Sequence, residues 1–179
     1  MALQLGGKAP DFQLPGVDGK HYSLETFANK LLLGVVFSCN HCPYVKAYED
    51  RLISIQKQFA AKGLALVAIN ANDDKNYPDD SFDRMVLRAR EKGFNFPYLR
   101  DETQATAKAY AASRTPHIFL LDKDRQLRYT GAIDDNWEHP GRVKQNYLID
   151  AIEALLKNED PPRKETFPVG CSIKWRPDK

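Results

Sequence analysis

The chain has 179 residues, of which 42% are hydrophobic and 28% are charged, and its formal net charge at pH 7 is +2. This length suits one compact domain that buries about two-thirds of its unfolded surface. A charge so close to neutral gives no reason to expect nucleic acid or an anionic membrane as a partner. The sequence shows neither the pattern of a signal peptide nor that of a membrane span, so we expect a cytoplasmic location.

The first predicted elements are two short strands between Asp11 and Lys30. Residues 15–19, which include proline and two glycines, separate these strands in the manner of a hairpin turn. Ser23 is a suitable N-cap for a single helical turn that ends at Phe27. We expect this hairpin to extend the sheet at the N-terminus.

The most informative stretch runs from Lys30 to Ala61. Its apolar run Leu31–Phe37, rich in Val and Leu, suits a strand that is covered on both faces. Hydrophobic residues then recur at steps of three and four, as on an amphipathic helix. These residues are Val45, Tyr48, Leu52, Ile55 and Phe59. The segment Cys39-Asn40-His41-Cys42-Pro43 lies between strand and helix, which predicts that both cysteines stand at the helix N-terminus.

A helix N-terminus favours a thiolate, because its free N–H groups and its dipole stabilise negative charge. We therefore expect the pKa of Cys39 to fall below its ordinary value of about 8.5. On this reasoning Cys39 attacks a disulfide, and Cys42 resolves the mixed disulfide. His41 lies between them and can stabilise the thiolate. Two other interpretations stay open, namely a zinc site, which needs two more ligands, and an inert pair of small core residues.

Strands and helices alternate along the rest of the domain, which predicts an α/β architecture with a right-handed βαβ unit. The expected strands cover residues 64–70, 96–99, 116–121 and 126–130, and the expected helices cover residues 81–92, 103–112 and 143–157. Asn70, Asn72 and Asp73 follow the first of these strands, at the edge where α/β sheets place their sites. These side chains either face the dithiol or shape the turn.

The end of the chain differs in composition from the domain before it. We divide the chain into a domain of residues 1–157 and a tail of residues 158–179. The tail begins with a polar linker and ends in a segment that contains Cys171 and Trp175. This pattern predicts that the tail docks on the domain or on a partner.

Several motifs, in a fixed order, resemble those of a known family. They are Ala9-Pro10-Asp11-Phe12 with Leu14, Phe37-Ser38-Cys39-Asn40-His41-Cys42-Pro43-Tyr44-Val45-Lys46-Ala47, Thr115-Pro116 and Gly170-Cys171-Ser172-Ile173-Lys174-Trp175. Nearly the whole chain resembles thioredoxin-like proteins, and more narrowly a peroxiredoxin-like branch of the alkyl hydroperoxide reductase/thiol-specific antioxidant family. The resemblance implies a thioredoxin-like fold, in which a central mixed sheet has helices on both faces and an N-terminal β-hairpin extension.

The same resemblance implies roles for residues near the end of the chain. It implies that Thr115 precedes a cis-proline, Pro116, that faces the dithiol. It also makes Cys171 a candidate resolving cysteine, although a merely buried tail cysteine explains this residue equally well.

The function implied is that of a thiol–disulfide oxidoreductase in redox homeostasis or antioxidant defence. Its partners are a protein or small-molecule disulfide and a thiol reductant, and a homodimer is compatible with this function. We expect no cofactor and no metal. Two alternatives remain, namely a thiol-dependent peroxidase and a non-enzymatic redox-sensing module.

The chain also departs from both families. Peroxiredoxins place a Pro and a Thr before the peroxidatic cysteine, whereas the corresponding positions hold Val35 and Cys39 before Cys42, and Leu32 and Val36 before Cys39. The peroxidatic arginine is missing from its usual position, and Arg114 is close but displaced. Thioredoxins carry a buried Asp beneath the dithiol, but the strand 31–37 contains no acid. This absence leaves Lys46 and Glu49 on the helix as candidates for proton transfer.

Overall fold

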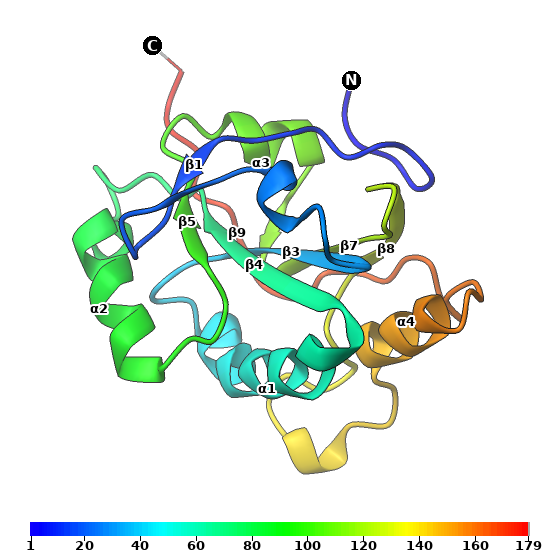
Figure 1. Cartoon of the computed structure of the whole chain (residues 1–179). Helices are drawn as coiled ribbons and strands as arrows, with labels where there is room; N and C mark the ends of the chain where they lie inside the picture. Colours follow the sequence, from blue (N-terminus) through cyan, green and yellow to red (C-terminus); the bar gives the residue numbers. More distant parts are fainter. Residues whose placement is uncertain (179) are drawn as a thin grey trace.

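The computed structural model describes residues 1–178 and has a five-stranded central sheet (Figure 1). The strands are β3 (Leu32–Ser38), β4 (Leu64–Asn70), β5 (Tyr98–Arg100), β7 (His117–Leu121) and β8 (Leu127–Gly131). Their order in the sheet is β5-β4-β3-β7-β8. Strand β4 runs parallel to β3 and β5, whereas β7 is antiparallel to both β3 and β8. This mixed sheet confirms the predicted α/β fold.

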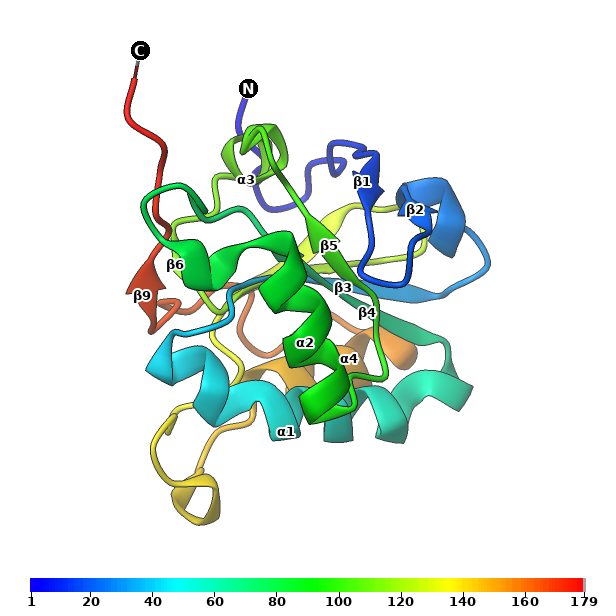
Figure 2. The same ribbon diagram turned by 90° about the vertical axis from the view of Figure 1, so that its left-hand side faces the viewer.

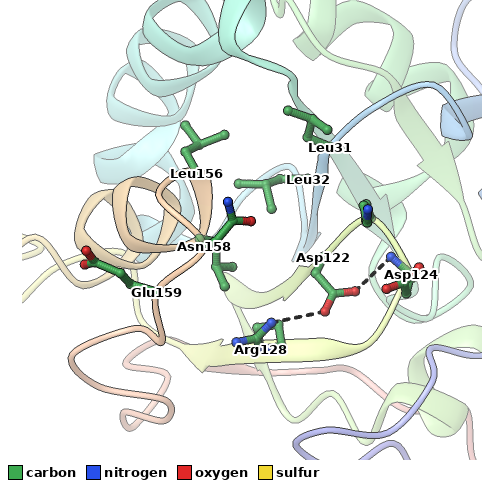
Figure 3. A pocket seen from close by; sticks show the side chains of 10 residues that line it. Leu31, Leu32, Asp122, Asp124, Arg128, Leu156, Asn158 and Glu159 are labelled. Carbon is green, nitrogen blue, oxygen red and sulfur yellow. Dashed lines mark hydrogen bonds and ion pairs between the residues drawn. The ribbon is translucent and has the colours of Figure 1, made fainter.

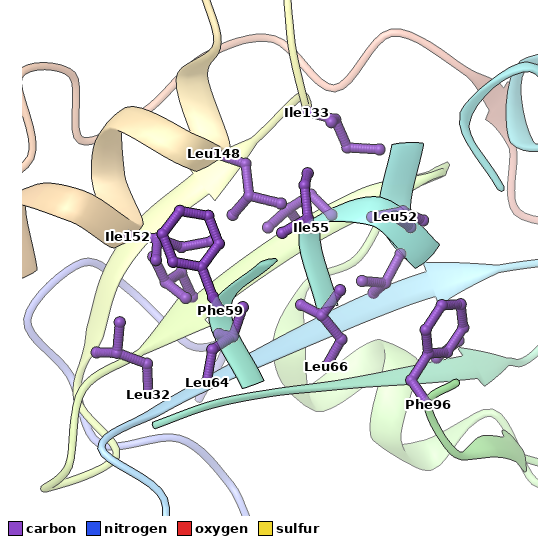
Figure 4. Packing of buried hydrophobic residues seen from close by; sticks show 14 of the residues in the cluster. Leu32, Leu52, Ile55, Phe59, Leu64, Leu66, Phe96, Ile133, Leu148 and Ile152 are labelled. Atoms are coloured by element: carbon purple, nitrogen blue, oxygen red, sulfur yellow. The ribbon is translucent and has the colours of Figure 1, made fainter. Parts of the chain in front are cut away.

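Helices cover both faces of the sheet (Figure 2). They are α1 (Pro43–Phe59), α2 (Phe82–Lys92), α3 (Ala105–Tyr110) and α4 (Tyr147–Leu156), with 3-10 turns at Leu24–Phe27, Ala60–Lys62, Pro78–Asp80 and Pro140–Arg142. On one face α1 and α4 pack on the sheet through residues such as Ile55, Phe59 and Ile152 (Figure 4). The other face carries α3 and the N-terminal segment. Every residue of β3 and β4 is buried as a result, which explains their continuous apolar sequences.

Two helices are shorter than predicted, and in each case a local contact accounts for the difference. Helix α4 begins at Tyr147 because residues 143–145 instead pair with the preceding loop, where Asp135 accepts a hydrogen bond from the Lys144 N–H at 2.9 Å. Helix α3 ends at Tyr110 because Ala111 has a left-handed backbone, with φ of 58°. These boundaries depend on contacts that the hydrophobic period does not reveal.

The N-terminal hairpin forms as predicted, with β1 (Leu14–Pro15) and β2 (His21–Tyr22) in antiparallel register. The prediction that it extends the central sheet is wrong, because these strands form a separate two-stranded sheet. Pro15 has no N–H with which to continue a ladder, so the strand ends there. A bridge between Gly16 and Leu99 and a hydrogen bond from the Val17 N–H to the Tyr98 carbonyl join the hairpin to β5 at the edge of the central sheet.

The tail follows the domain surface and forms a second two-stranded sheet. Its strand β9 (Cys171–Ser172) pairs antiparallel with β6 (Arg114–Thr115), directly before β7. Figure 2 shows β6 and β9 together at one end of the sheet, near the start of α1. Among residues 1–178, no helix has the length and hydropathy needed to cross a membrane.

Candidate active site

The two cysteines of the motif lie in the turn between β3 and α1. Strand β3 ends at Ser38, and α1 begins at Pro43, whose missing N–H has no partner to lose in a first helical turn. Both cysteines are free thiols and are almost fully buried, with 2% exposure for Cys39 and 1% for Cys42. The N-cap of the helix is Cys42, three residues later than the sulfur that the sequence analysis favoured.

Both sulfurs face the same residue, Thr115. The Cys39 Sγ lies 3.5 Å from the Thr115 hydroxyl oxygen, and the Cys42 Sγ lies 3.4 Å from the Thr115 carbonyl oxygen. The peptide bond from Thr115 to Pro116 is cis, as the resemblance implied. Thr115 belongs to β6 (Arg114–Thr115), so the end of this short strand lies against the dithiol.

The protonation of the dithiol is opposite to the prediction. A hydrogen bond donated to Cys42, together with burial and the negative charge of Asp80, raises the pKa of Cys39 well above its ordinary value. The pKa of Cys42 is lowered, first because Cys39 donates to it and then because Cys171 and the Val45 N–H also donate. The Cys42 thiol donates to the Thr115 carbonyl, which opposes a thiolate on Cys42, but it is one acceptor against several donors. The predicted fall in the pKa of Cys39 is thus wrong, because Cys39 donates to Cys42, is buried and lies near the negative charge of Asp80.

A buried carboxylate beside the dithiol escaped the sequence analysis. Asp80 has no exposed surface, and it accepts hydrogen bonds from the Asn40 N–H at 2.8 Å and from the side-chain amides of Asn70 and Asn72 at 3.1 and 3.0 Å. The Tyr98 hydroxyl donates to Asn40 at 2.7 Å and completes this network. The local sequence does not distinguish the buried Asp80 from the exposed polar residues beside it. Asn70 and Asn72 at the end of β4 were nevertheless a signal that a polar partner lay nearby.

His41 connects this carboxylate to the surface. Its Nδ1 lies 2.9 Å from Asp80 Oδ2, but the ring is not aligned for a hydrogen bond with the carboxylate. The imidazole stacks on Tyr77, with ring centroids 6.4 Å apart. Ligand atoms of Cys39, His41 and Asp80 all lie within 4.8 Å of one another. This set of donors could hold a zinc ion, and it supplies ligands that the sequence alone did not locate.

The other predicted residues lie in different surroundings. The Glu49 carboxylate is buried and ion-paired with Arg88 of α2. Lys46 lines a hollow that it shares with His41 and Arg88. Arg114 places its guanidinium over the Phe167 ring, 5.8 Å from the ring centroid.

The polar residues after β4 divide into two groups. Asn70 and Asn72 turn inward to the Asp80 network described above. Asp73 is also buried, but it binds the Asn76 side chain and lies near Arg176 of the tail. The alternative that these residues only shape the turn therefore fails for the two asparagines.

A separate hollow lies at the opposite end of β3 from the dithiol (Figure 3). Leu31 and Leu32 line one side, and Asp122 and Arg128, which form an ion pair at 3.2 Å, line another. Because Cys39 follows the last residue of β3 and this hollow surrounds the first, the hollow takes no part in the thiol chemistry.

The comparisons with known proteins agree with this geometry. A family model described as Redoxin matches residues 4–146. The thiol–disulfide oxidoreductase ResA of Geobacillus thermodenitrificans is 27% identical over 133 residues, which cover 71% of this chain and 68% of that protein. An uncharacterized conserved protein from Geobacillus kaustophilus has a solved structure with a TM-score of 0.93 at 40% identity, covering 99% of this chain and 95% of that chain. A hypothetical protein from Sinorhizobium meliloti superposes with a TM-score of 0.90 at 37% identity, covering 98% and 97%.

Proposed function

This chain belongs to the Redoxin family, and on that premise we propose that Cys39 and Cys42 are the dithiol with which it acts as a thiol–disulfide oxidoreductase. The observation that carries the proposal is the placement of both sulfurs against Thr115 at the β3–α1 junction. Two neighbouring thiols, one with a raised and one with a lowered pKa, are suited to stepwise disulfide exchange.

Cys42 is the attacking sulfur in this proposal, because the pKa of Cys42 is lowered and that of Cys39 is raised. Its thiolate attacks a substrate disulfide, forms a mixed disulfide and releases one substrate thiolate. Cys39 then loses its proton and attacks the Cys42 sulfur, which forms the Cys39–Cys42 disulfide and releases the second substrate thiolate. A thiol reductant returns the protein to the dithiol.

Asp80 is the proton acceptor for Cys39 in the second step. Its carboxylate is the acid that the strand 31–37 lacks, supplied instead by the loop before α2. The imidazole of His41, in contact with Asp80 and 33% exposed, connects the carboxylate to solvent. Lys46 and Glu49 are not needed for this proton transfer.

Single cysteine variants test the assignment of roles. With a disulfide-bonded peptide as substrate and Cys171→Ser as the common background, both Cys39→Ser and Cys42→Ser should lose turnover, and only Cys39→Ser should accumulate a mixed disulfide through Cys42. A mixed disulfide in Cys42→Ser alone would reverse the roles, and full turnover in both variants would reject the dithiol. Stopped-flow oxidation by hydrogen peroxide, run in parallel, measures the peroxidase alternative, and zinc analysis of the reduced protein measures the metal alternative.

The finer expectations stay predictions. They are a cytoplasmic location, a role in antioxidant defence, a homodimer, a non-enzymatic sensing role as the last alternative, and the division into residues 1–157 and 158–179.

A further inference from the structure

The tail strand lies against the loop that faces the dithiol. Cys171 is opposite Thr115 and Ser172 is opposite Arg114 in an antiparallel register, and the Ile173 N–H donates to the Ser113 carbonyl at 3.2 Å. Gly170 makes this approach possible, because a Cβ at that position would collide with the Thr115 carbonyl. The position beside Thr115, where an extended polypeptide could pair, is thus filled by the protein's own chain.

Anchors on both sides of β9 hold it in place. Before β9, the Thr166 N–H donates to the Thr130 carbonyl, and the Thr166 hydroxyl accepts a hydrogen bond from the Ala132 N–H. After β9, Ile173 is 4% exposed and belongs to the core. Lys174 binds Asn72 through its N–H at 2.9 Å. Arg176 binds the Gln104 side chain through its N–H at 3.0 Å, and its guanidinium is ion-paired with acidic residues. The cysteine between these anchors has a defined position.

That position is beside Cys42. Cys171 packs on the cluster of Cys39, Cys42 and Val45, and its thiol and backbone are among the groups that lower the pKa of Cys42. Cys171 is half-buried, whereas the other two cysteines are almost fully enclosed. Building on the proposed function, we propose that Cys171 is a third redox cysteine, which takes the disulfide from Cys39 by forming a bond to Cys42 and presents it to the thiol reductant.

The step is an exchange without a further oxidant. The Cys171 sulfur loses its proton to water and attacks the Cys42 sulfur of the Cys39–Cys42 disulfide. A Cys42–Cys171 bond forms, the Cys39–Cys42 bond breaks, and Cys39 leaves as a thiolate that takes up a proton. The number of disulfides stays at one. The reductant, a thiol, then attacks the more accessible Cys171 sulfur, and a second equivalent completes the reduction.

The electrostatics of the site favour ionisation of Cys171 in the oxidised protein over the dithiol form. In the dithiol form, burial and then the hydrogen bond and charge of Cys42 raise the pKa of Cys171 to about 11. Oxidation of Cys42 removes its negative charge, so the thiolate of Cys171 becomes easier to form at the moment when it has a disulfide to attack.

Peptide mapping without reduction tests the proposal. Trypsin releases Cys39 and Cys42 together in residues 31–46 and Cys171 in residues 165–174. The reduced full chain is oxidised with oxidised glutathione, quenched in acid, alkylated and digested. We expect the 31–46 and 165–174 peptides to be linked in part of the wild-type protein and in most of the Cys39→Ser protein, and to be unlinked in Cys42→Ser. The linkage should form within monomers at a rate independent of protein concentration.

A shifted cysteine supplies the matched control. The double variant Cys171→Ser with Ser172→Cys keeps the number of cysteines but turns the thiol to the other face of the strand. Its linkage should fall at least about tenfold, because contact with Cys42 is lost. Equal linkage in this control, or free Cys171 in both wild type and Cys39→Ser while the Cys39–Cys42 disulfide forms, would overturn the inference and leave the proposed function standing. If no disulfide forms within residues 31–46 of the wild type and none links these peptides, the proposed function fails as well.

Discussion

Asp80→Asn is the most direct test of the acid beside the dithiol. The substitution removes one negative charge and keeps the size of the side chain. Because the charge of Asp80 contributes to the raised pKa of Cys39, its removal should lower that pKa. Proton transfer from Cys39 should also slow, so the mixed disulfide should persist longer.

The geometry sets the magnitude. The ligand atoms of Asp80 and Cys39 lie within 4.8 Å of each other. Two unit charges at that distance repel by about 3.5 kcal/mol at an effective dielectric constant of about 20, which corresponds to about 2.5 in pKa. Polar neighbours and solvent near His41 reduce this value, so we expect the pKa of Cys39 to fall by about one to two. Loss of the proton acceptor should slow resolution by about 10²-fold.

The assay is the alkylation of Cys39 against pH in a Cys42→Ser background, where Cys39 titrates without a coupled thiol. Resolution is measured in protein that retains Cys42, as the lifetime of the mixed disulfide. The side-chain amide introduced by Asp80→Asn would aim an N–H group at the donors from which the carboxylate now accepts, at a cost of about 1–3 kcal/mol. Unfolding by urea must therefore show that the variant is folded throughout the titration.

The matched control is Asp79→Asn, which removes the same charge from the adjacent, exposed residue. It should change the pKa of Cys39 by less than about 0.5, because exposed charges are screened by solvent. An unchanged pKa in Asp80→Asn, or equal changes in the two variants, would refute the assignment of Asp80.

Three further predictions concern the framework of the site. Burial lowers the pKa of His117 from 6.5 to about 4, so its stabilising contribution is complete above pH 6.5 and is lost as the pH falls toward 4. The free energy of unfolding should decrease by up to about 3 kcal/mol across this pH window. Urea unfolding at several pH values should show no such decrease in His117→Gln. The control His139→Gln, at an exposed position, should show the same decrease as the wild type. Arg88→Met leaves the buried Glu49 carboxylate without its ion pair and should lower the free energy of unfolding by about 3–5 kcal/mol. Arg90 is exposed on the same helix, so Arg90→Met should lower it by less than about 0.5 kcal/mol. Similar losses in both variants would show that the ion pair does not support the fold. Gly170→Ala should lower the free energy of unfolding by about 1–3 kcal/mol through the clash with Thr115, and it should slow formation of the Cys42–Cys171 disulfide. The control is Gly141→Ala, because Gly141 has open space around it. If the disulfide formed at the same rate in Gly170→Ala, the contact of Gly170 would not be what places Cys171.

The sequence alone determined the elements whose signals are local. The buried strands β3 and β4, the amphipathic helix α1 and the turn before it follow from the period and composition of consecutive residues, and the structure reproduces both strands within one residue and the helix with a start one turn later. The pair Cys39 and Cys42 was recognised for the same reason, because a strand that leads into a helix is visible in a single stretch of about thirty residues.

Tertiary structure decided which groups act on those sulfurs. A helix start shifted by one turn gives the N–H groups to Cys42 instead of Cys39, and hydrophobic period does not define a boundary that closely. Asp80 lies 41 residues after Cys39 in the sequence, and Cys171 lies 129 residues after Cys42; they reach the dithiol through a loop after β4 and a strand beside Thr115. The protonation of a buried thiol depends on the charges and donors within a few ångströms of it, and only the packing of distant segments brings those groups there.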